Sequence, residues 1–395
     1  MKYRRFGKTE LDMPVLTAGG MRFQASWKAD ETDKITQEGQ ANVEACLRRA
    51  LEQGINHFET ARGYGTSELQ MGRAMRDLPR DEIILQTKVG PTKKGKEFLQ
   101  QFDDSLERLQ VDSVDLLAIH GINTDEKLAM TLARGGPLEA AERLREAGRT
   151  RHVGFSTHGP TDVIVKTIAT DRFEYVNLHW FWIQQDRWPA IEAAKARDMG
   201  VFIISPSDKG GRLYEPSDKI VRLCRPLSPI AFNDLFCLKH EEVHTISIGA
   251  RRPSDYDEHI RAVEMLDDPQ ADRLVRQIGE RLTAEFRTAL GEEWYATWSE
   301  GLPDWPDTPG EVNIPFILWL YNLAKALDLV KFGRDRYGLL GNSGDWVPGK
   351  KLGDVDPRDL ADALSRSPHA ERIPAVLAEA HAMFAGKEGK PLQEK

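Results

Sequence analysis

The chain has 395 residues, of which 40% are apolar and 29% are charged, and this balance excludes a disordered or fibrous protein. The net charge of −8 argues against a nucleic-acid partner, because a nucleic-acid surface requires a basic patch. The length allows one large α/β domain with an appended part, or two or three average domains.

Cysteines and apolar runs indicate the compartment. Cys46, Cys224 and Cys237 lack Cys-x-x-Cys spacing, so we expect reduced thiols and no metal site. Residues 1–7 lack the apolar segment of a secretory signal. The longest apolar run, 314–324, is well below the roughly 20 residues of a membrane span. We therefore expect a cytoplasmic protein with no membrane partner, and the sequence leaves its oligomeric state open.

Short apolar runs alternate with amphipathic segments up to about residue 268, which predicts repeated βα units and a parallel sheet. After an opening hairpin-like piece, eight runs read as strands, the number that closes an α/β fold of the (β/α)8 TIM-barrel type. The expected strands are 15–18, 55–58, 83–87, 115–119, 150–155, 174–178, 201–204 and 244–248. A doubly wound open sheet is the competing fold, but its glycine-rich phosphate-binding turn is missing after the first strand.

Helices are expected between these strands, because apolar residues recur there at helical spacing. The expected helices are 40–53, 67–77, 94–109, 137–147, 160–170, 187–198 and 254–266, with a helical stretch at 218–240 that is harder to segment.

The sequence changes character after Asp267-Asp268-Pro269, so we divide it into a barrel, 1–268, and a mostly helical extension, 269–395. A tryptophan-rich irregular stretch and a glycine-rich loop are expected within the extension, at 291–309 and 333–357. Residues 386–395 are expected to fray. The helices expected in the extension are 270–289, 314–332, 358–365 and 373–384.

Four ionisable residues stand at or just after the ends of three predicted strands, where barrels carry their catalytic groups: Glu59, Tyr64, Lys88 and His120. A Tyr, with an ordinary pKa of about 10, needs a nearby cation to release its proton near neutral pH. A buried Lys needs an anion to stay charged. The pattern allows Lys88 to be the cation that lowers the pKa of Tyr64 and Glu59 to be the anion that keeps Lys88 charged, while His120 either orients a carbonyl oxygen or relays a proton. Solvated rim charges are the alternative.

These residues resemble the aldo-keto reductases, (β/α)8 barrels that transfer a hydride between a nicotinamide nucleotide and a carbonyl or alcohol. The resemblance implies a catalytic tetrad of Tyr64, Lys88, His120 and Glu59, the last standing where the family has Asp. It rests on Phe58-Glu59-Thr60-Ala61, Tyr64-Gly65, Ser67-Glu68, Thr87-Lys88, Asp115-Leu116-Leu117 with His120, and Gly154-Phe155-Ser156.

The resemblance also implies NADP as cofactor, with NAD as the alternative. The segment from Gly249 is similar to the one that holds the adenosine phosphates, where Arg251 or Arg252 would pair with a 2′-phosphate. Ser156 and Asn177 fall where the family holds the nicotinamide carboxamide. The full set of expected cofactor-binding residues is Met21, Ser156, Asn177, Ser205, Gly210, Gly211, Leu213, Gly249, Arg251, Arg252, Ser254 and His259.

Loops after the strands are expected to line a substrate pocket, and the leading candidates are Arg22, Trp27, Arg62 and Trp180, within a wider group that includes His158. Aromatic rings with Arg side chains would suit a sugar-like or anionic carbonyl compound, or a flat ring stacked on Trp. A packing role is the alternative for 180–182.

The extension resembles a subgroup of these reductases that carries a bacterial-type ferredoxin module with two [4Fe–4S] clusters, through motifs such as Leu320-Tyr321-Asn322 and Arg336-Tyr337. The cluster cysteines are missing, because no cysteine follows Cys237. The resemblance therefore implies a degenerate ferredoxin-like extension without Fe–S clusters, in which Trp305 and Leu360 fill the vacated volume as core. At the cluster spacings the sequence has Ser299, Leu302, Trp305 and Thr308, then Pro357, Leu360, Ala363 and Ser367.

The sequence thus predicts an NAD(P)(H)-dependent oxidoreductase of aldo-keto reductase type, whose partner is a small-molecule carbonyl or alcohol substrate. The alternative is a nucleotide-binding partner protein that kept the barrel and lost turnover. The replacement of Asp by Glu59 and the lost cluster ligands motivate this alternative.

Overall fold

The computed structural model describes residues 1–353 and 355–385, so the predicted fraying of 386–395 lies outside the described residues. These residues form two compact units. The first comprises 1–210 and 230–272, and the second comprises 211–229 and the chain from 273 onward. The predicted boundary at 268 lies near the last of these divisions, whereas the passage of 211–229 into the second unit was not anticipated.

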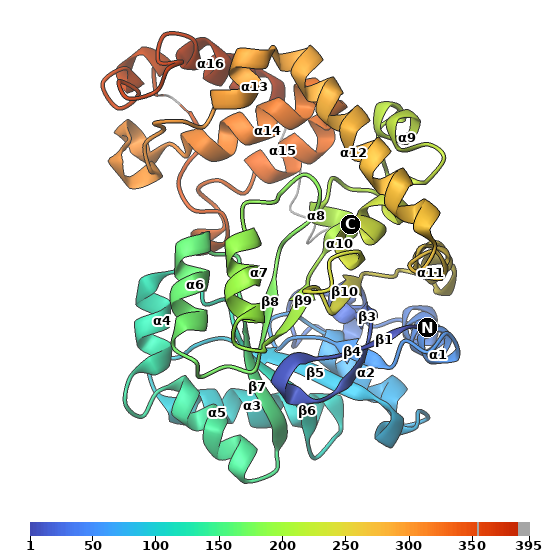
Figure 1. Cartoon of the computed structure of the whole chain (residues 1–395). Helices are drawn as coiled ribbons and strands as arrows, with labels where there is room; N and C mark the ends of the chain where they lie inside the picture. Colours follow the sequence, from blue (N-terminus) through green and yellow to red (C-terminus); the bar gives the residue numbers. More distant parts are fainter. Residues whose placement is uncertain (354, 386–395) are drawn as a thin grey trace. The chain divides into compact units, whose positions relative to one another are not determined.

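The first unit contains a closed barrel of eight parallel strands, and the predicted (β/α)8 fold is confirmed (Figure 1). Each strand pairs with the next one in sequence, and the last closes the ring against the first. All eight predicted strands are present, as β3 (Leu16–Gly19), β4 (His57–Glu59), β5 (Ile84–Val89), β6 (Val114–His120), β7 (Thr150–Ser156), β8 (Tyr175–Leu178), β9 (Gly200–Ile203) and β10 (Thr245–Ile248).

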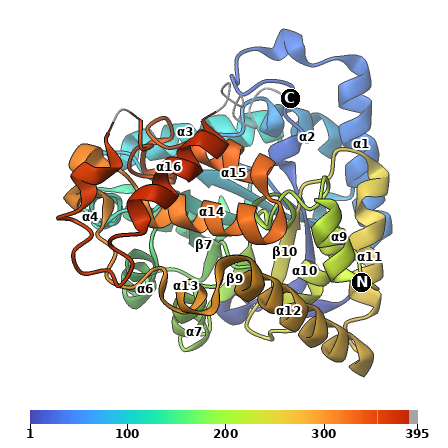
Figure 2. The same cartoon turned by 90° about the horizontal axis from the view of Figure 1, so that it is seen from above.

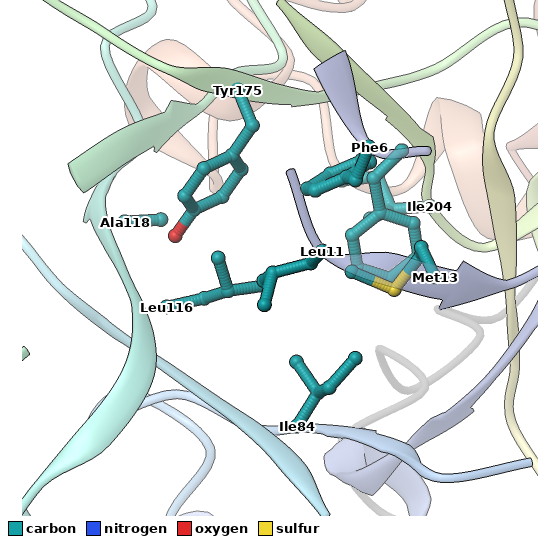
Figure 3. Packing of buried hydrophobic residues seen from close by; sticks show 9 residues of the cluster. Phe6, Leu11, Met13, Ile84, Leu116, Ala118, Tyr175 and Ile204 are labelled. Carbon is teal, nitrogen blue, oxygen red and sulfur yellow. The ribbon is translucent and has the colours of Figure 1, made fainter. Parts of the chain in front are cut away.

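An antiparallel hairpin of β1 (Tyr3–Arg5) and β2 (Asp12–Pro14) precedes the barrel, as expected. Phe6 of this hairpin packs into a buried apolar cluster with Leu116 and Tyr175 of the barrel strands (Figure 3). Gly200, the first residue of β9, lies so close to the Phe6 ring that a Cβ there would clash. The hairpin therefore packs at the amino ends of the strands, and the carboxyl ends carry the polar chemistry.

Helices follow the strands and pack their apolar faces on the barrel. In α1 (Gln37–Glu52) the buried residues recur at helical spacing, and the Thr36 side chain caps the first turn. A helix that was not expected, α4 (Asp125–Leu132), buries only Leu128 and Thr131, too few for a clear periodic signal. The other helices of this unit are α2 (Ser67–Met75), α3 (Gly95–Leu109), α5 (Pro137–Glu146), α6 (Thr161–Ala169), α7 (Trp188–Lys195), α8 (Pro206–Lys209), α10 (Pro229–Leu238) and α11 (Tyr256–Glu264).

The second unit is helical, as predicted for the extension. Within it α14 (Ile314–Leu327) packs against α15 (Val330–Tyr337) and α16 (Ile373–Phe384), and these two also contact each other (Figure 2). The Trp294 indole donates a hydrogen bond of 2.8 Å to Asn322 of α14. The remaining helices are α9 (Asp218–Cys224), α12 (Pro269–Leu290), which begins in the first unit, and α13 (Glu292–Thr297).

Several boundaries predicted in the extension were wrong. The single helix 314–332 is interrupted at Asp328, which adopts a left-handed conformation (φ 55°) and ends α14. Segment 358–365 forms only a 3-10 turn, Pro357–Leu360. The stretch 291–309, expected to be irregular, contains α13. Outside the extension, the helical stretch expected at 218–240 is confirmed and consists of α9 and α10, separated by a segment with Pro226.

The positions compared with cluster cysteines have separate roles. Leu360 is fully buried, as expected, whereas Trp305 is only half-buried and is not a core residue. The Thr308 hydroxyl lies 2.8 Å from the carbonyl oxygen of Trp305 and 2.9 Å from that of Val312. Over the described part of the chain, we find no group of three or more His, Cys, Asp or Glu side chains arranged to hold a metal. No described helix combines the length and apolarity that crossing a membrane requires.

Candidate active site

The carboxyl ends of β4, β5 and β6 bring the four predicted catalytic residues together. Lys88 forms an ion pair with Glu59 and donates a hydrogen bond of 2.8 Å to the Thr60 carbonyl oxygen. Its Nζ lies 4.7 Å from the centroid of the Tyr64 ring. The Tyr64 and His120 rings meet edge to face, with centroids 5.8 Å apart. The arrangement is a compact cluster of an acid, an amine, a phenol and an imidazole.

Burial governs the charges of this cluster. The Lys88 side chain is fully buried, and this lowers its pKa well below the ordinary value, while the Glu59 carboxylate favours the charged ammonium. Burial raises the pKa of the half-buried Tyr64 above its ordinary value, so Tyr64 is a neutral phenol. The direction of this shift is opposite to the one expected from Lys88, and a lowering of the Tyr64 pKa by Lys88 stays a prediction.

His120 is also neutral. Burial and the positive charges of Lys88, Lys127 and Lys209 lower its pKa to about 3. A neutral imidazole carries one N–H donor and one acceptor nitrogen, so it can hydrogen-bond a carbonyl oxygen without competing as an acid.

The turn that carries Tyr64 is fixed by residues that the sequence reading did not assign. The Thr87 hydroxyl donates a hydrogen bond of 2.6 Å to the buried Glu68 carboxylate, and the Ser67 hydroxyl donates one of 2.8 Å to the Gly20 carbonyl oxygen. Gly65 has a positive φ of 56° and lies against the backbone of Ser26, so no Cβ fits there. The Ser67-Glu68 pair, which begins three residues after Tyr64, was the available signal.

Ser156 and Asn177, expected at the nicotinamide carboxamide, are paired neighbours on β7 and β8. Both are buried, and the Ser156 hydroxyl accepts a hydrogen bond of 3.2 Å from the Gly121 N–H. Neither amide atom of Asn177 has a hydrogen-bond partner among residues 1–353 and 355–385. Because an unsatisfied buried polar group costs about 1–3 kcal/mol, this amide is suited to a ligand that brings a complementary amide.

In the segment expected to bind phosphate, the Asp255 side chain accepts the hydrogen bonds that a phosphate was expected to accept. The Asp255 carboxylate accepts hydrogen bonds from the backbone N–H groups of Arg251 (2.8 Å) and Arg252 (3.3 Å), and from Arg252 Nε (3.0 Å). Arg251, Arg252 and Ser254 are exposed. A phosphate that bound to these N–H groups would have to displace the Asp255 carboxylate. The sequence did not predict that Asp255 would accept these hydrogen bonds.

Other expected cofactor residues are dispersed. His259 is buried, and its Nδ1 lies 2.5 Å from the Asp234 carboxylate. Arg22 donates a hydrogen bond of 2.8 Å to the Gly249 carbonyl oxygen, which places this substrate candidate beside the expected phosphate segment.

Met21 is half-buried in the turn after β3. Ser205 and Gly210 flank α8 in the first unit, whereas Gly211 and Leu213 belong to the second.

The remaining substrate candidates differ in setting. The backbone of Trp27 lies against Gly65, next to Tyr64. The Arg62 guanidinium lies 3.4 Å from the Asp104 carboxylate of α3. Trp180 is buried and stacks on Phe236, with ring centroids 4.7 Å apart, so its geometry is that of a packing residue.

The sequence similarity to a known protein family lies within the first unit of the chain. The sequence model of the aldo/keto reductase family matches residues 15–210. L-galactose dehydrogenase of Arabidopsis thaliana is 36% identical over 140 residues, covering 32% of this chain and 41% of that enzyme. L-glyceraldehyde 3-phosphate reductase of Escherichia coli K12 is 29% identical over 176 residues, covering 40% of this chain and 46% of that enzyme. The chain thus spans less than half the length of these curated relatives.

Solved structures show the same barrel. An aldo-keto reductase from Bacillus halodurans in its holo form aligns with a TM-score of 0.58 and 23% identity, over 71% of this chain and 96% of that one. An aldo-keto reductase from Klebsiella pneumoniae in complex with NADPH aligns with a TM-score of 0.56 and 21% identity, over 70% and 95% of the two chains. Residues 15–210, within the first unit, thus match the aldo/keto reductase family in sequence, and this unit has the barrel fold of these solved structures.

Proposed function

We propose that the chain is an NAD(P)(H)-dependent oxidoreductase that interconverts a small carbonyl compound and its alcohol. The observation that carries this proposal is the neutral Tyr64 phenol set between the Lys88 ammonium and the neutral His120 imidazole. A nicotinamide nucleotide, when bound, supplies the hydride equivalent for this chemistry.

Each residue of the tetrad has a distinct task. Tyr64 gives its proton to the substrate oxygen during reduction and takes it back during oxidation. Lys88 stabilises the phenolate left behind, because its charge lies 4.7 Å from the ring in a buried setting. His120 orients the carbonyl oxygen with a neutral N–H. Glu59 keeps the buried Lys88 charged.

The nucleotide site is proposed from the residues that fit it. Asn177, with its unpaired buried amide, and Ser156 would hold the carboxamide. The segment from Gly249 to Arg252 would hold the adenosine phosphates after Asp255 turns away. NADP is the proposed cofactor and NAD the alternative.

The finer features of the protein are proposals of the same kind. Two of the relatives act, by their names, on a sugar and on a sugar phosphate, which supports a sugar-like substrate. The extension is proposed to be a degenerate ferredoxin-like module, without Fe–S clusters because no cysteine follows Cys237. A cytoplasmic location and the division of the chain near residue 268 are also proposed.

Fluorescence titration of the full chain with NADPH and NADH, followed by a screen of aldehydes, ketones and sugars, tests the proposal. We expect saturable nucleotide binding and reduction of at least one carbonyl compound. Nucleotide binding without turnover on any of them would instead establish the nucleotide-binding partner protein.

A further inference from the structure

A second group of basic side chains lies beyond the ends of the neighbouring strands, outside the tetrad. His158 follows β7, His179 follows β8, and Lys209 ends α8, which follows β9. Lys209 Nζ lies 2.8 Å from His179 Nε2 and 3.3 Å from His158 Nδ1. The two imidazole rings meet with centroids 4.5 Å apart. We call these three residues the basic cluster.

We propose that the basic cluster binds an oxyanion carried by the substrate, a phosphate or a carboxylate, and so selects anionic carbonyl compounds. This inference rests on the function proposed for the neighbouring tetrad and names its substrate class.

The hydrogen bonds of Lys209 fix which ring nitrogen of each histidine is the acceptor. An ammonium group only donates, so His158 Nδ1 and His179 Nε2 must both accept. In a neutral imidazole the proton then lies on the other nitrogen, His158 Nε2 and His179 Nδ1. Burial, followed by the charge of Lys209, lowers the pKa of His158 well below its ordinary value, which keeps it in this form. One ammonium group and two imidazole N–H groups are the kinds of donor that bind oxyanions in proteins.

The backbone around the basic cluster is held in place. The buried Arg187 guanidinium donates hydrogen bonds to the carbonyl oxygens of His158 (3.3 Å) and Gly159 (3.2 Å). His179 is itself buried, with 5% of its surface exposed. A site made of fixed side chains loses little conformational entropy on binding its ligand.

The basic cluster acts on the tetrad electrostatically. The positive charge of Lys209 contributes to the lowered pKa values of both His120 and His158. A substrate whose carbonyl oxygen lies at Tyr64 and His120 would therefore carry its anionic end into the same positive field.

A nucleotide phosphate is the competing source of the same chemistry, because Lys209 precedes Gly210 in a loop expected to cover the pyrophosphate. Two members of the cluster favour the substrate. His158 and His179 stand two residues beyond Ser156 and Asn177, the residues expected at the nicotinamide rather than at the phosphates.

Steady-state kinetics of the full chain on matched substrates tests the inference. Glyceraldehyde 3-phosphate is compared with glyceraldehyde, and succinic semialdehyde with butanal. We expect kcat/KM to favour the anionic member at least about tenfold, mainly through KM, since hydrogen bonds to charged groups contribute about 1.5–3 kcal/mol. Lys209→Met should lower this ratio by at least about tenfold, and Lys209→Arg should restore part of it. Lys166→Met, which removes an exposed cation from α6, should leave the ratio within about twofold.

Two binding measurements separate the sources. Calorimetric titration of the full chain with inorganic phosphate should show binding that Lys209→Met weakens at least about tenfold, while its NADPH and NADH affinities stay within about threefold of wild type. Weaker nucleotide affinity with an unchanged substrate ratio would assign the basic cluster to the nucleotide and overturn the inference. Equal turnover of charged and neutral substrates would overturn it while leaving the proposed function intact. If no carbonyl is reduced, the proposed function fails, and phosphate binding that Lys209→Met does not weaken would remove the oxyanion site as well.

Discussion

The rings of Tyr64 and His120 meet edge to face, with centroids 5.8 Å apart and planes at 86°. Both groups are neutral, because burial raises the pKa of the phenol and lowers that of the imidazole to about 3. The phenol is therefore the only proton donor of this pair suited to general acid catalysis, and the imidazole is left to position the substrate.

Replacing Tyr64 by Phe should remove the proton donor while keeping the ring that contacts Lys88 and His120. Carbonyl reduction should fall by about 10²–10⁴-fold, the usual contribution of general acid catalysis. Nucleotide affinity, measured by fluorescence titration, should stay within about twofold. Turnover equal to that of the wild type would remove Tyr64 from its proposed role.

Replacing Glu59 by Gln should leave the buried Lys88 without its counter-charge. The free energy of unfolding should fall by about 3 kcal/mol, as expected when one partner of a buried ion pair is lost. Urea denaturation at neutral pH measures this loss. Glu59→Asp is the matched control, since it keeps the carboxylate, and the double variant Glu59→Gln/Lys88→Met should recover part of the stability. A loss below about 0.5 kcal/mol would show that the pair does not stabilise the fold.

Asn177→Leu separates a ligand-binding role from a structural one. Since the amide makes no hydrogen bond within the described part of the chain, its removal should leave the free energy of unfolding unchanged or raise it by about 1 kcal/mol. Nucleotide affinity should fall about tenfold. Thermal melts and nucleotide titrations give the two values, and a large loss of stability with unchanged nucleotide affinity would reverse the assignment.

The barrel should lose stability in acid through His57. This fully buried imidazole lies 2.7 Å from the Thr17 hydroxyl and 3.1 Å from the Gln86 amide, and burial lowers its pKa to about 3. The unfolded chain takes up the proton near pH 6.5, whereas the folded chain resists it until about pH 3. The stabilisation from the neutral imidazole is thus complete above pH 6.5 and is lost progressively as the pH falls.

The size of this effect is measurable against a variant. Between about pH 6 and pH 4, His57→Gln should reduce the pH dependence of the unfolding free energy by up to about 1.4 kcal/mol per pH unit. Urea midpoints across this range supply the slopes. Identical slopes for the two proteins would mean that His57 does not titrate on unfolding.

The barrel strands and the residues at their ends could be predicted, because they follow from local residue patterns. Each barrel strand is a short apolar run, and the tetrad stands at strand ends, so both the fold and the proximity of Lys88 to Tyr64 followed from the order of the elements. Helix α4 was missed because an eight-residue helix with two buried residues has little periodicity. The break at Asp328 depends on a single left-handed residue, which a continuous apolar pattern conceals.

Other features depend on contacts that have no signature in residue spacing. The basic cluster joins three residues that follow the neighbouring strands β7, β8 and β9, and the contacts of Lys209 with His158 and His179 depend on how their side chains are oriented. Asp255 reads as an ordinary helix-start acid, yet its carboxylate takes the backbone donors expected for a phosphate. Such competition within the chain is visible only once the side chains are placed.

The assignment of 211–229 to the second unit determines where the chain can be divided. This segment is held there by the ion pairs of Arg212 with Asp335 (2.5 Å) and Lys219 with Glu285 (2.7 Å), and by the Ser217 hydroxyl on the Leu327 carbonyl oxygen (2.8 Å). A fragment ending at residue 268 would keep 211–229 but lack all three partners, so residue 268 is not a clean boundary between the two units. A segment between β9 and β10 and the chain after residue 273 thus share one compact unit, and removing the extension would leave this segment without the contacts that hold it.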